Sequence, residues 1–163
     1  MALDKNKYEQ TILYLCSKLG GEVKGKKKLA KLLYFADFDF FEKNNQSITG
    51  DTYRALPMGP FPTMLECVAK DMEKNGMLNV EMVEEFNGYN PTETYSAKKK
   101  PDASVFTIDE KKMLDRIITR YGKLNGKQLE DLTHAEAPYI GTEPGNVIAY
   151  ELSSYRGTDF GDL

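Results

Sequence analysis

The spacing of apolar residues predicts a helix over residues 5–19 and a second, more apolar helix over residues 27–43. In the first segment, apolar side chains recur every three or four positions and would line one face. Gly20 and Gly21 would end this helix, because glycine accepts left-handed backbone. The second segment, KKLAKLLYFADFDFFEK, carries apolar residues around most of its circumference. Helices of this kind are buried on several sides, so we expect it to be the central helix of the domain.

Residues 44–76 predict a polar loop, a short extended piece and a third helix. The extended piece is expected over residues 53–55. Residues 58–62, MGPFP, predict a rigid turn without regular structure, because each proline fixes φ and lacks a backbone donor. The helix would run to about residue 75 and place its apolar side chains on one face, namely Phe61, Met64, Leu65, Val68 and Met72.

From residue 77 onward the apolar period changes from helical to alternating, which predicts a half-buried strand. Asn87 and Gly88 form a turn signal. A second strand over residues 92–97 would complete an antiparallel hairpin, and a further short strand is expected over residues 104–106.

The C-terminal third predicts two capped helices followed by mostly irregular chain. Thr107 with Glu110, and Asn125 with Gln128, have the spacing of capping boxes, in which each side chain satisfies the other residue's backbone N–H. After the second helix, which would end near His134, we expect irregular chain with one short helix over residues 150–155.

Composition agrees with one globular domain. The 163 residues are 40% hydrophobic and 29% charged, which is enough to bury a core. The sequence has no run of about 18 apolar residues that could cross a membrane, and its N-terminal residues lack the apolar stretch of a secretory signal. We therefore expect a cytoplasmic α+β protein: a mainly α-helical single domain over residues 1–157 with a small antiparallel β-hairpin, and a loose C-terminal tail over residues 158–163.

Residues with metal-binding or nucleophilic chemistry are few. Cys16 and Cys67 fall on helix faces assigned to the core, and the single histidine, His134, falls at a helix end. A structural zinc site needs about four such ligands in close array. We expect the cysteines to be small core residues and His134 to cap or hydrogen-bond the helix end. We predict no catalytic residue, no metal and no cofactor; an enzyme that uses His134 as its base stays an alternative.

Two aspartates lie on the predicted central helix, Asp37 and Asp39. Residues two positions apart on a helix point to different sides, which argues against a shared acid–base site. We expect surface or capping roles for both. The sequence also has no glycine-rich phosphate-binding run, so mononucleotide chemistry has no support.

A run of lysines, Lys24, Lys26, Lys27, Lys28 and Lys31, gathers at the start of the central helix. A solvated face is the simplest interpretation. Contact with an acidic partner or with nucleic-acid phosphates are the alternatives. The net charge of −3 argues against a dedicated nucleic-acid binder, and the aromatic circumference of the helix suits burial better than a DNA groove.

The turn that contains Arg54, Met58 and Phe61 combines rigid backbone with an arginine and apolar side chains. This combination is typical of partner-binding edges, and a turn that plugs the core is the alternative. Our candidates for contact with a partner are exposed side chains of the lysine run and of this turn, namely Lys26, Lys27, Lys28, Arg54, Met58 and Phe61.

Three segments, taken in order, resemble the motifs of one family. Residues 28–37, KLAKLLYFAD, resemble a K-L-x-K-L-x-Y-x-A helix, and residues 49–60, TGDTYRALPMGP, resemble a T-G…A…x-G-P segment. Residues 132–139, LTHAEAPY, are similar to a T-H-x-x-x-P-W segment, with Tyr139 where tryptophan is common. The family is the Panacea, or SocA-like antitoxin, domain. Its motif positions in this chain are Lys28, Lys31, Tyr34, Gly59, Pro60, Thr133 and His134.

The resemblance implies a bacterial or phage antitoxin domain of a toxin–antitoxin system, which neutralises a protein toxin by binding it and without chemistry. Some members of the family present the toxin to a AAA+ protease, so the resemblance includes such a protease among the candidate partners. A nucleic-acid-binding regulator that uses the Lys24–Lys31 patch is the alternative function. The sequence sets neither the toxin nor the oligomeric state, and it predicts no membrane partner.

Overall fold

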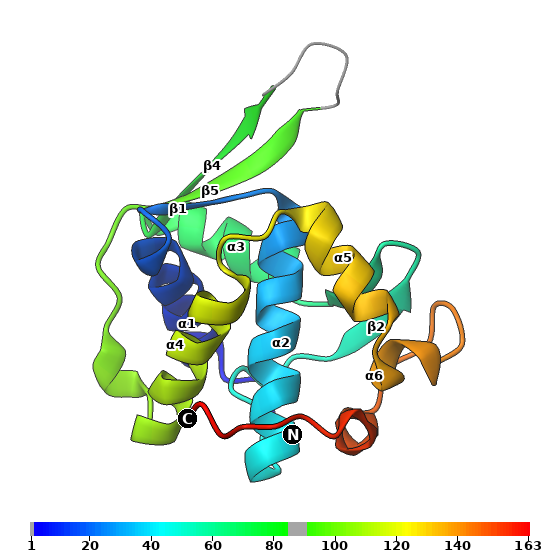
Figure 1. The fold of residues 1–163 in the computed structure, drawn as a ribbon. Coiled ribbons are helices and arrows are strands. Elements are labelled where there is room, and N and C mark those ends of the chain that lie inside the picture. Colours follow the sequence, from blue (N-terminus) through cyan, green and yellow to red (C-terminus); the bar gives the residue numbers. More distant parts are fainter. Residues whose placement is uncertain (1, 85–90) are drawn as a thin grey trace.

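The computed structural model describes residues 2–84 and 91–163 (Figure 1). Its helices are α1 (Lys5–Lys18), α2 (Lys26–Asn44), α3 (Leu65–Lys74), α4 (Ile108–Tyr121), α5 (Gly126–His134), α6 (Ala137–Ile140) and the 3₁₀ helices η1 (Ala103–Val105) and η2 (Tyr150–Arg156). Its strands are β1 (Glu22–Lys24), β2 (Tyr53–Leu56), β3 (Gly59–Pro62), β4 (Leu78–Val83) and β5 (Thr92–Ala97). The prediction of a mainly helical α+β fold with an antiparallel hairpin is confirmed.

Helix α2 lies at the centre of the molecule, with α1, α4 and α5 around it (Figure 1). Every residue from 29 to 40 is buried. The helix packs against α4, α5, β3 and η2. The apolar circumference that predicted a central helix is therefore explained by neighbours on all its sides.

The predicted β4–β5 hairpin is present, with Val80 opposite Tyr95 and Val83 opposite Thr92. The turn signal at Asn87 and Gly88 lies outside the described residues. The sheet also has a third strand that the sequence did not predict, because β1 pairs with β5 and gives the order β1-β5-β4. Three residues are too few to show an alternating pattern.

The prediction of irregular chain over residues 58–62 is wrong, because β2 and β3 form a second antiparallel hairpin. Pro60 and Pro62 are tolerated for a geometric reason. The backbone N–H of Thr63 bonds Thr52, so the hydrogen-bonded positions of β3 are the odd-numbered ones. Both prolines are even-numbered, and their missing N–H groups would have pointed away from β2.

The predictions from local sequence signals in the C-terminal half were confirmed in part. Both predicted capping boxes, at Thr107 and Asn125, are formed. The strand predicted over residues 104–106 is wrong: the chain forms the 3₁₀ helix η1, in which Asp102 accepts a hydrogen bond from the N–H of Ser104. Cys16 is buried as predicted, whereas Cys67 is exposed, so the core role predicted for Cys67 is wrong.

The two aspartates of α2 are buried, so their expected surface or capping roles are wrong. Asp37 accepts hydrogen bonds from the N–H groups of Ile48 (2.9 Å) and Thr49 (2.8 Å) and from the hydroxyls of Thr49 (2.6 Å) and Tyr53 (2.6 Å). Burial raises the pKa of the Asp37 carboxyl to about 6, and these hydrogen bonds oppose the shift. Asp37 therefore holds the loop that leads into β2 against the central helix.

Asp39 lies on the other side of α2, where it pairs with Arg116 of α4 (3.0 Å) and Arg156 of η2 (2.7 Å). Burial raises the pKa of the Asp39 carboxyl to about 6, while Arg156 opposes that shift. Both arginines are almost completely buried. The ion pairs attach α4 and η2 to the same turn of the central helix.

The last residues, which we expected to be loose, make specific contacts. Glu42 accepts hydrogen bonds from the N–H (2.8 Å) and the hydroxyl (2.8 Å) of Thr158. The guanidinium of Arg116 lies 4.8 Å from the centre of the Phe160 ring, and its Nε donates to Asp162 (2.8 Å). These contacts join the chain after η2 to α2 and α4.

We expect Asp37→Ala to lower the free energy of unfolding by at least about 3 kcal/mol, because it leaves two backbone N–H groups and two hydroxyls buried without an acceptor. Tyr53→Phe, which removes one of these donors, is the matched comparison and should cost about 1 kcal/mol. Urea denaturation at neutral pH measures both. Equal losses in the two variants would contradict the role given to Asp37.

Candidate protein interface

Four of the family-motif residues meet where α2, β3 and α5 come together. The Lys31 ammonium donates a hydrogen bond to the carbonyl of Pro60 (3.1 Å). Gly59 has φ +109°, and a Cβ placed there would lie 2.8 Å from Cε of Lys31 and 2.9 Å from Oγ1 of Thr133. This close packing leaves no space for a side chain at residue 59. We call this group, Lys31, Gly59, Pro60 and Thr133, the motif cluster.

Lys31 is buried, with 1% of its surface exposed. Burial lowers the pKa of its ammonium to about 8, and the charge of Lys27 acts in the same direction, while Glu130 opposes the shift. The lysine was expected to belong to a solvated run. In the structure its ammonium is bonded to β3 of the β2–β3 hairpin.

The other motif residues also make contacts within the fold. Lys28 donates a hydrogen bond to the carbonyl of Gly122 (2.7 Å) at the end of α4. The Tyr34 hydroxyl donates to Glu136 (2.8 Å). His134 is the last residue of α5 and its ring stacks on that of Tyr139 at 4.6 Å.

The expectation that Lys26, Lys27 and Lys28 are exposed is wrong, because all three are only partly accessible. Lys26 pairs with Glu66 (2.7 Å) and lies 3.5 Å from Glu93. Lys27 pairs with Glu130 (3.0 Å). Glutamates of the same chain therefore already neutralise much of the predicted basic patch.

The candidates in the β2–β3 hairpin are more accessible. Met58, in the turn, has 61% of its surface exposed; Arg54 is exposed, and Phe61 is partly buried. Leu56 is also exposed. The exposed Val147 lies beside the hairpin, because its backbone forms a bridge with Arg54. We call Arg54, Leu56, Met58 and Val147 the hairpin surface.

The sequence pattern did not indicate Val147, nor Ile140, which is exposed on α6. Helix α6 is held near the hairpin because the hydroxyl of its Tyr139 donates to the carbonyl of Leu56 (2.6 Å). Both apolar residues fall in a segment without periodicity, so only the fold reveals that Val147 lies beside Arg54 and that the helix of Ile140 is bonded to the hairpin. Figure 1 shows β2, α5 and α6 on one side of the molecule.

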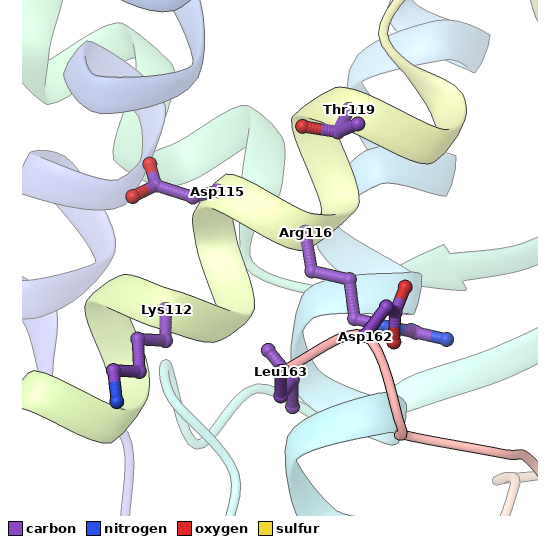
Figure 2. Close-up of a pocket in the computed structure, with 6 residues that line it drawn as sticks. All are labelled: Lys112, Asp115, Arg116, Thr119, Asp162 and Leu163. Atoms are coloured by element: carbon purple, nitrogen blue, oxygen red, sulfur yellow. The ribbon is translucent and has the colours of Figure 1, made fainter.

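A hollow of about 330 Å³ also lies between α4 and the C-terminal residues, and none of its lining residues belongs to the hairpin surface. Figure 2 shows Arg116 directed toward Asp162, while Lys112 extends away from that pair. The charged groups at its centre are already paired, since Arg116 binds Asp39 and Asp162, and Asp115 accepts a hydrogen bond from Tyr14. These contacts attach the C-terminal segment to α4.

Within residues 2–84 and 91–163, no three His, Cys, Asp or Glu side chains lie close enough together to hold a metal ion. In the same part of the chain, no helix combines the length and the apolar character needed to cross a bilayer.

The family model of the SocA-like antitoxin, Panacea domain matches residues 29–139, more than half of the chain. The chain belongs to this family. The match includes the whole motif cluster and confirms the resemblance seen in the sequence. Membership supports an antitoxin role and points to a non-catalytic one. No curated protein and no solved structure matches the chain significantly.

We expect Gly59→Ala to destabilise the SocA-like domain more than Gly145→Ala. Both glycines have positive φ, so both variants bear a backbone cost of about 1–2 kcal/mol. Only at Gly59 does the new Cβ meet Lys31 and Thr133, which should add about 1–3 kcal/mol; the space around Gly145 is open. Urea denaturation of both proteins gives the difference, and equal losses would show that the motif cluster is not tightly packed.

The free energy of unfolding should depend on pH through Lys31. The pKa of Lys31 is about 8 in the folded chain and 10.5 for an unperturbed lysine, so between these values the unfolded state binds more protons. The contribution of Lys31 to stability therefore rises with pH across this window. Lys31→Met should remove this pH-dependent contribution. The difference in free energy of unfolding between variant and parent should therefore change by about 2 kcal/mol from pH 8 to pH 10. Lys98→Met, at an exposed position, is the control and should keep the slope of the parent.

Proposed function

We propose that the chain neutralises a protein toxin by binding it directly through the hairpin surface, in the cytoplasm and without chemistry. The observation that carries the proposal is the grouping of exposed Arg54, Leu56 and Met58 on the hairpin, with the exposed Val147 beside them. Methionine and arginine are enriched at protein interfaces, and arginine is among the residues that most often carry the binding energy.

The hairpin is supported on both sides, which favours binding. The motif cluster holds β3 against α2 and α5. On the opposite edge, β2 is bonded to a neighbouring segment: the N–H of Ala55 donates to Asn146 (3.0 Å), and that of Ile148 donates to Tyr53 (2.8 Å). Surfaces fixed before contact lose little conformational entropy on binding, so more of the contact energy becomes affinity.

The alternative, a nucleic-acid-binding regulator, has less support from the same contacts. Lys26 and Lys27 pair with glutamates, and Lys31 is buried. Phosphate binding through these lysines would require breaking the ion pairs first. Affinity for nucleic acid that falls steeply with salt would favour this alternative.

A second part of the proposal concerns a AAA+ protease. A proteolytic adaptor binds the toxin and presents it for degradation, so the amount of toxin in the cell should fall when the antitoxin is present. In a host that lacks the protease, toxin should accumulate in the bound, harmless form. Direct masking alone predicts equal amounts of toxin in the two hosts.

The first experiment is co-expression of this chain with each product of the genes that flank its own. We expect one neighbour to inhibit growth alone, and to be rescued by and co-purify with this chain. The double variant Arg54→Glu, Met58→Asp should weaken this complex by at least about 30-fold, the effect of removing a central contact. Ile108→Asp changes an exposed apolar residue on α4 and is the control, which should keep full rescue.

Circular dichroism and thermal unfolding establish that both variants are folded before binding is compared. A folded double variant that binds and rescues like the parent would remove the hairpin surface from the proposal. If none of the neighbours is toxic or binds, direct neutralisation itself is contradicted.

A further inference from the structure

Strand β4 is an edge of the three-stranded sheet, whose order is β1-β5-β4. The N–H of Lys98 bonds the carbonyl of Met77, so the odd-numbered residues of β4 are those that bond β5. The backbone groups of Glu93 and Ala97 in β5 form hydrogen bonds on the β1 side. By the same alternation, the backbone N–H and C=O groups of the even-numbered residues of β5 point toward β4. The backbone N–H and C=O groups of Leu78, Val80 and Met82 therefore point outward from the sheet.

This edge has little of the usual protection against pairing. Natural edge strands are commonly blocked by proline, by charged side chains, especially lysine, or by shortness. Strand β4, LNVEMV, has six residues, contains neither proline nor lysine, and carries one charged residue, Glu81. Met82 has 62% of its surface exposed. In Figure 1, β4 and β5 extend away from the helical body.

A groove of about 380 Å³ lies beside this edge, between α3 and the sheet. Val80, Met82 and Tyr95 of the sheet and Ala69 of α3 form its apolar part. Charged side chains also line it, namely Lys26, Glu66, Lys70, Glu73 and Glu93. A strand added to β4 would place every second side chain on this face, next to Val80 and Met82.

Charge determines which strand fits. Glu81 is exposed on the opposite face of β4 and Glu84 follows the strand, whereas in the groove Lys26 already pairs with Glu66 and lies 3.5 Å from Glu93. Pairing with the β4 of a second copy in the register that sets Glu81 opposite Glu81 would bring like charges together, which destabilises cross-strand contacts. A segment with lysine or arginine opposite Glu81 is favoured instead.

We propose that the outer edge of β4 binds an extended segment of a partner protein by strand addition, with apolar residues on the α3 face alternating with lysine or arginine on the Glu81 face. Main-chain hydrogen bonds to Val80 and Met82 supply affinity, and the alternating side chains supply selectivity. The inference rests on the proposed function only in assigning this segment to the toxin.

The test uses the full chain and a short fluorescent peptide that alternates lysine with valine, followed by fluorescence anisotropy. Saturable binding is expected. The same peptide N-methylated at every second amide, on its bonding edge, should bind at least about tenfold more weakly, because it cannot pair with β4. A peptide that alternates glutamate with valine should also bind more weakly. No saturable binding, or equal binding of the N-methylated peptide, overturns the proposal.

Variants of β4 locate the site. Met82→Pro removes an outward N–H and leaves the ladder to β5 intact, so it should weaken binding at least about tenfold relative to Met82→Ala, the matched control for the lost side chain. Glu81→Lys should reverse the preference, so that the glutamate peptide binds more tightly than the lysine peptide. Because this charge test does not alter the backbone, it decides the matter even if Met82→Pro does not fold; an unchanged preference overturns the proposal.

These outcomes are separate from those of the growth assay. Edge binding that passes both tests in the absence of any toxic neighbour leaves the β4 site standing and contradicts the toxin assignment. Rescue by this chain without peptide binding supports the antitoxin proposal and overturns the β4 site.

Discussion

The structure depends on the burial of three charged side chains on one helix. Residues 29–40 of α2 are all buried, yet they include Lys31, Asp37 and Asp39. Charged groups removed from water are tolerated only with close partners. None of the three finds its partners on α2: Lys31 bonds β3, Asp37 bonds the loop before β2 together with Tyr53, and Asp39 bonds arginines of α4 and η2. One helix thereby positions most of the chain around it.

Such contacts select an arrangement more than they add stability. Buried ion pairs often contribute little net free energy, because desolvation offsets the attraction between the charges. Breaking one is expensive, however, so an alternative packing that leaves Asp39 without Arg116 and Arg156 is strongly disfavoured. Arg156 also pairs with Glu42 and Glu136, and a single network thus links α2, η2 and the start of α6. The position of α6, and so of the chain beside the β2–β3 hairpin, follows from charges in the core.

The sequence predicted those parts of the fold that local chemistry decides. Helical periods, both capping boxes and the β4–β5 hairpin depend on neighbours within a few residues, and all are present. The failures share a different cause. The prolines of β3 are compatible with a strand only because β2 lies on the side away from their nitrogens, and the pairing of Lys26 and Lys27 depends on distant glutamates. The candidate surface was predicted in part: Arg54 and Met58 were found from their turn, whereas Val147 needed the bridge to β2.

The residues that hold the hairpin in place differ from the residues that form its exposed surface. Lys31, Gly59 and Thr133 are buried and have little freedom to change, because Lys31 and Thr133 both pack closely against Gly59. Arg54 and Met58 face solvent, so substitutions there leave the core unaltered and can change the partner. The β4 edge would work differently, since main-chain hydrogen bonds accept many sequences and only charge and alternation restrict the choice. A domain with one surface that is selective through side chains and another that is permissive through its backbone could exchange one toxin for another without refolding around it.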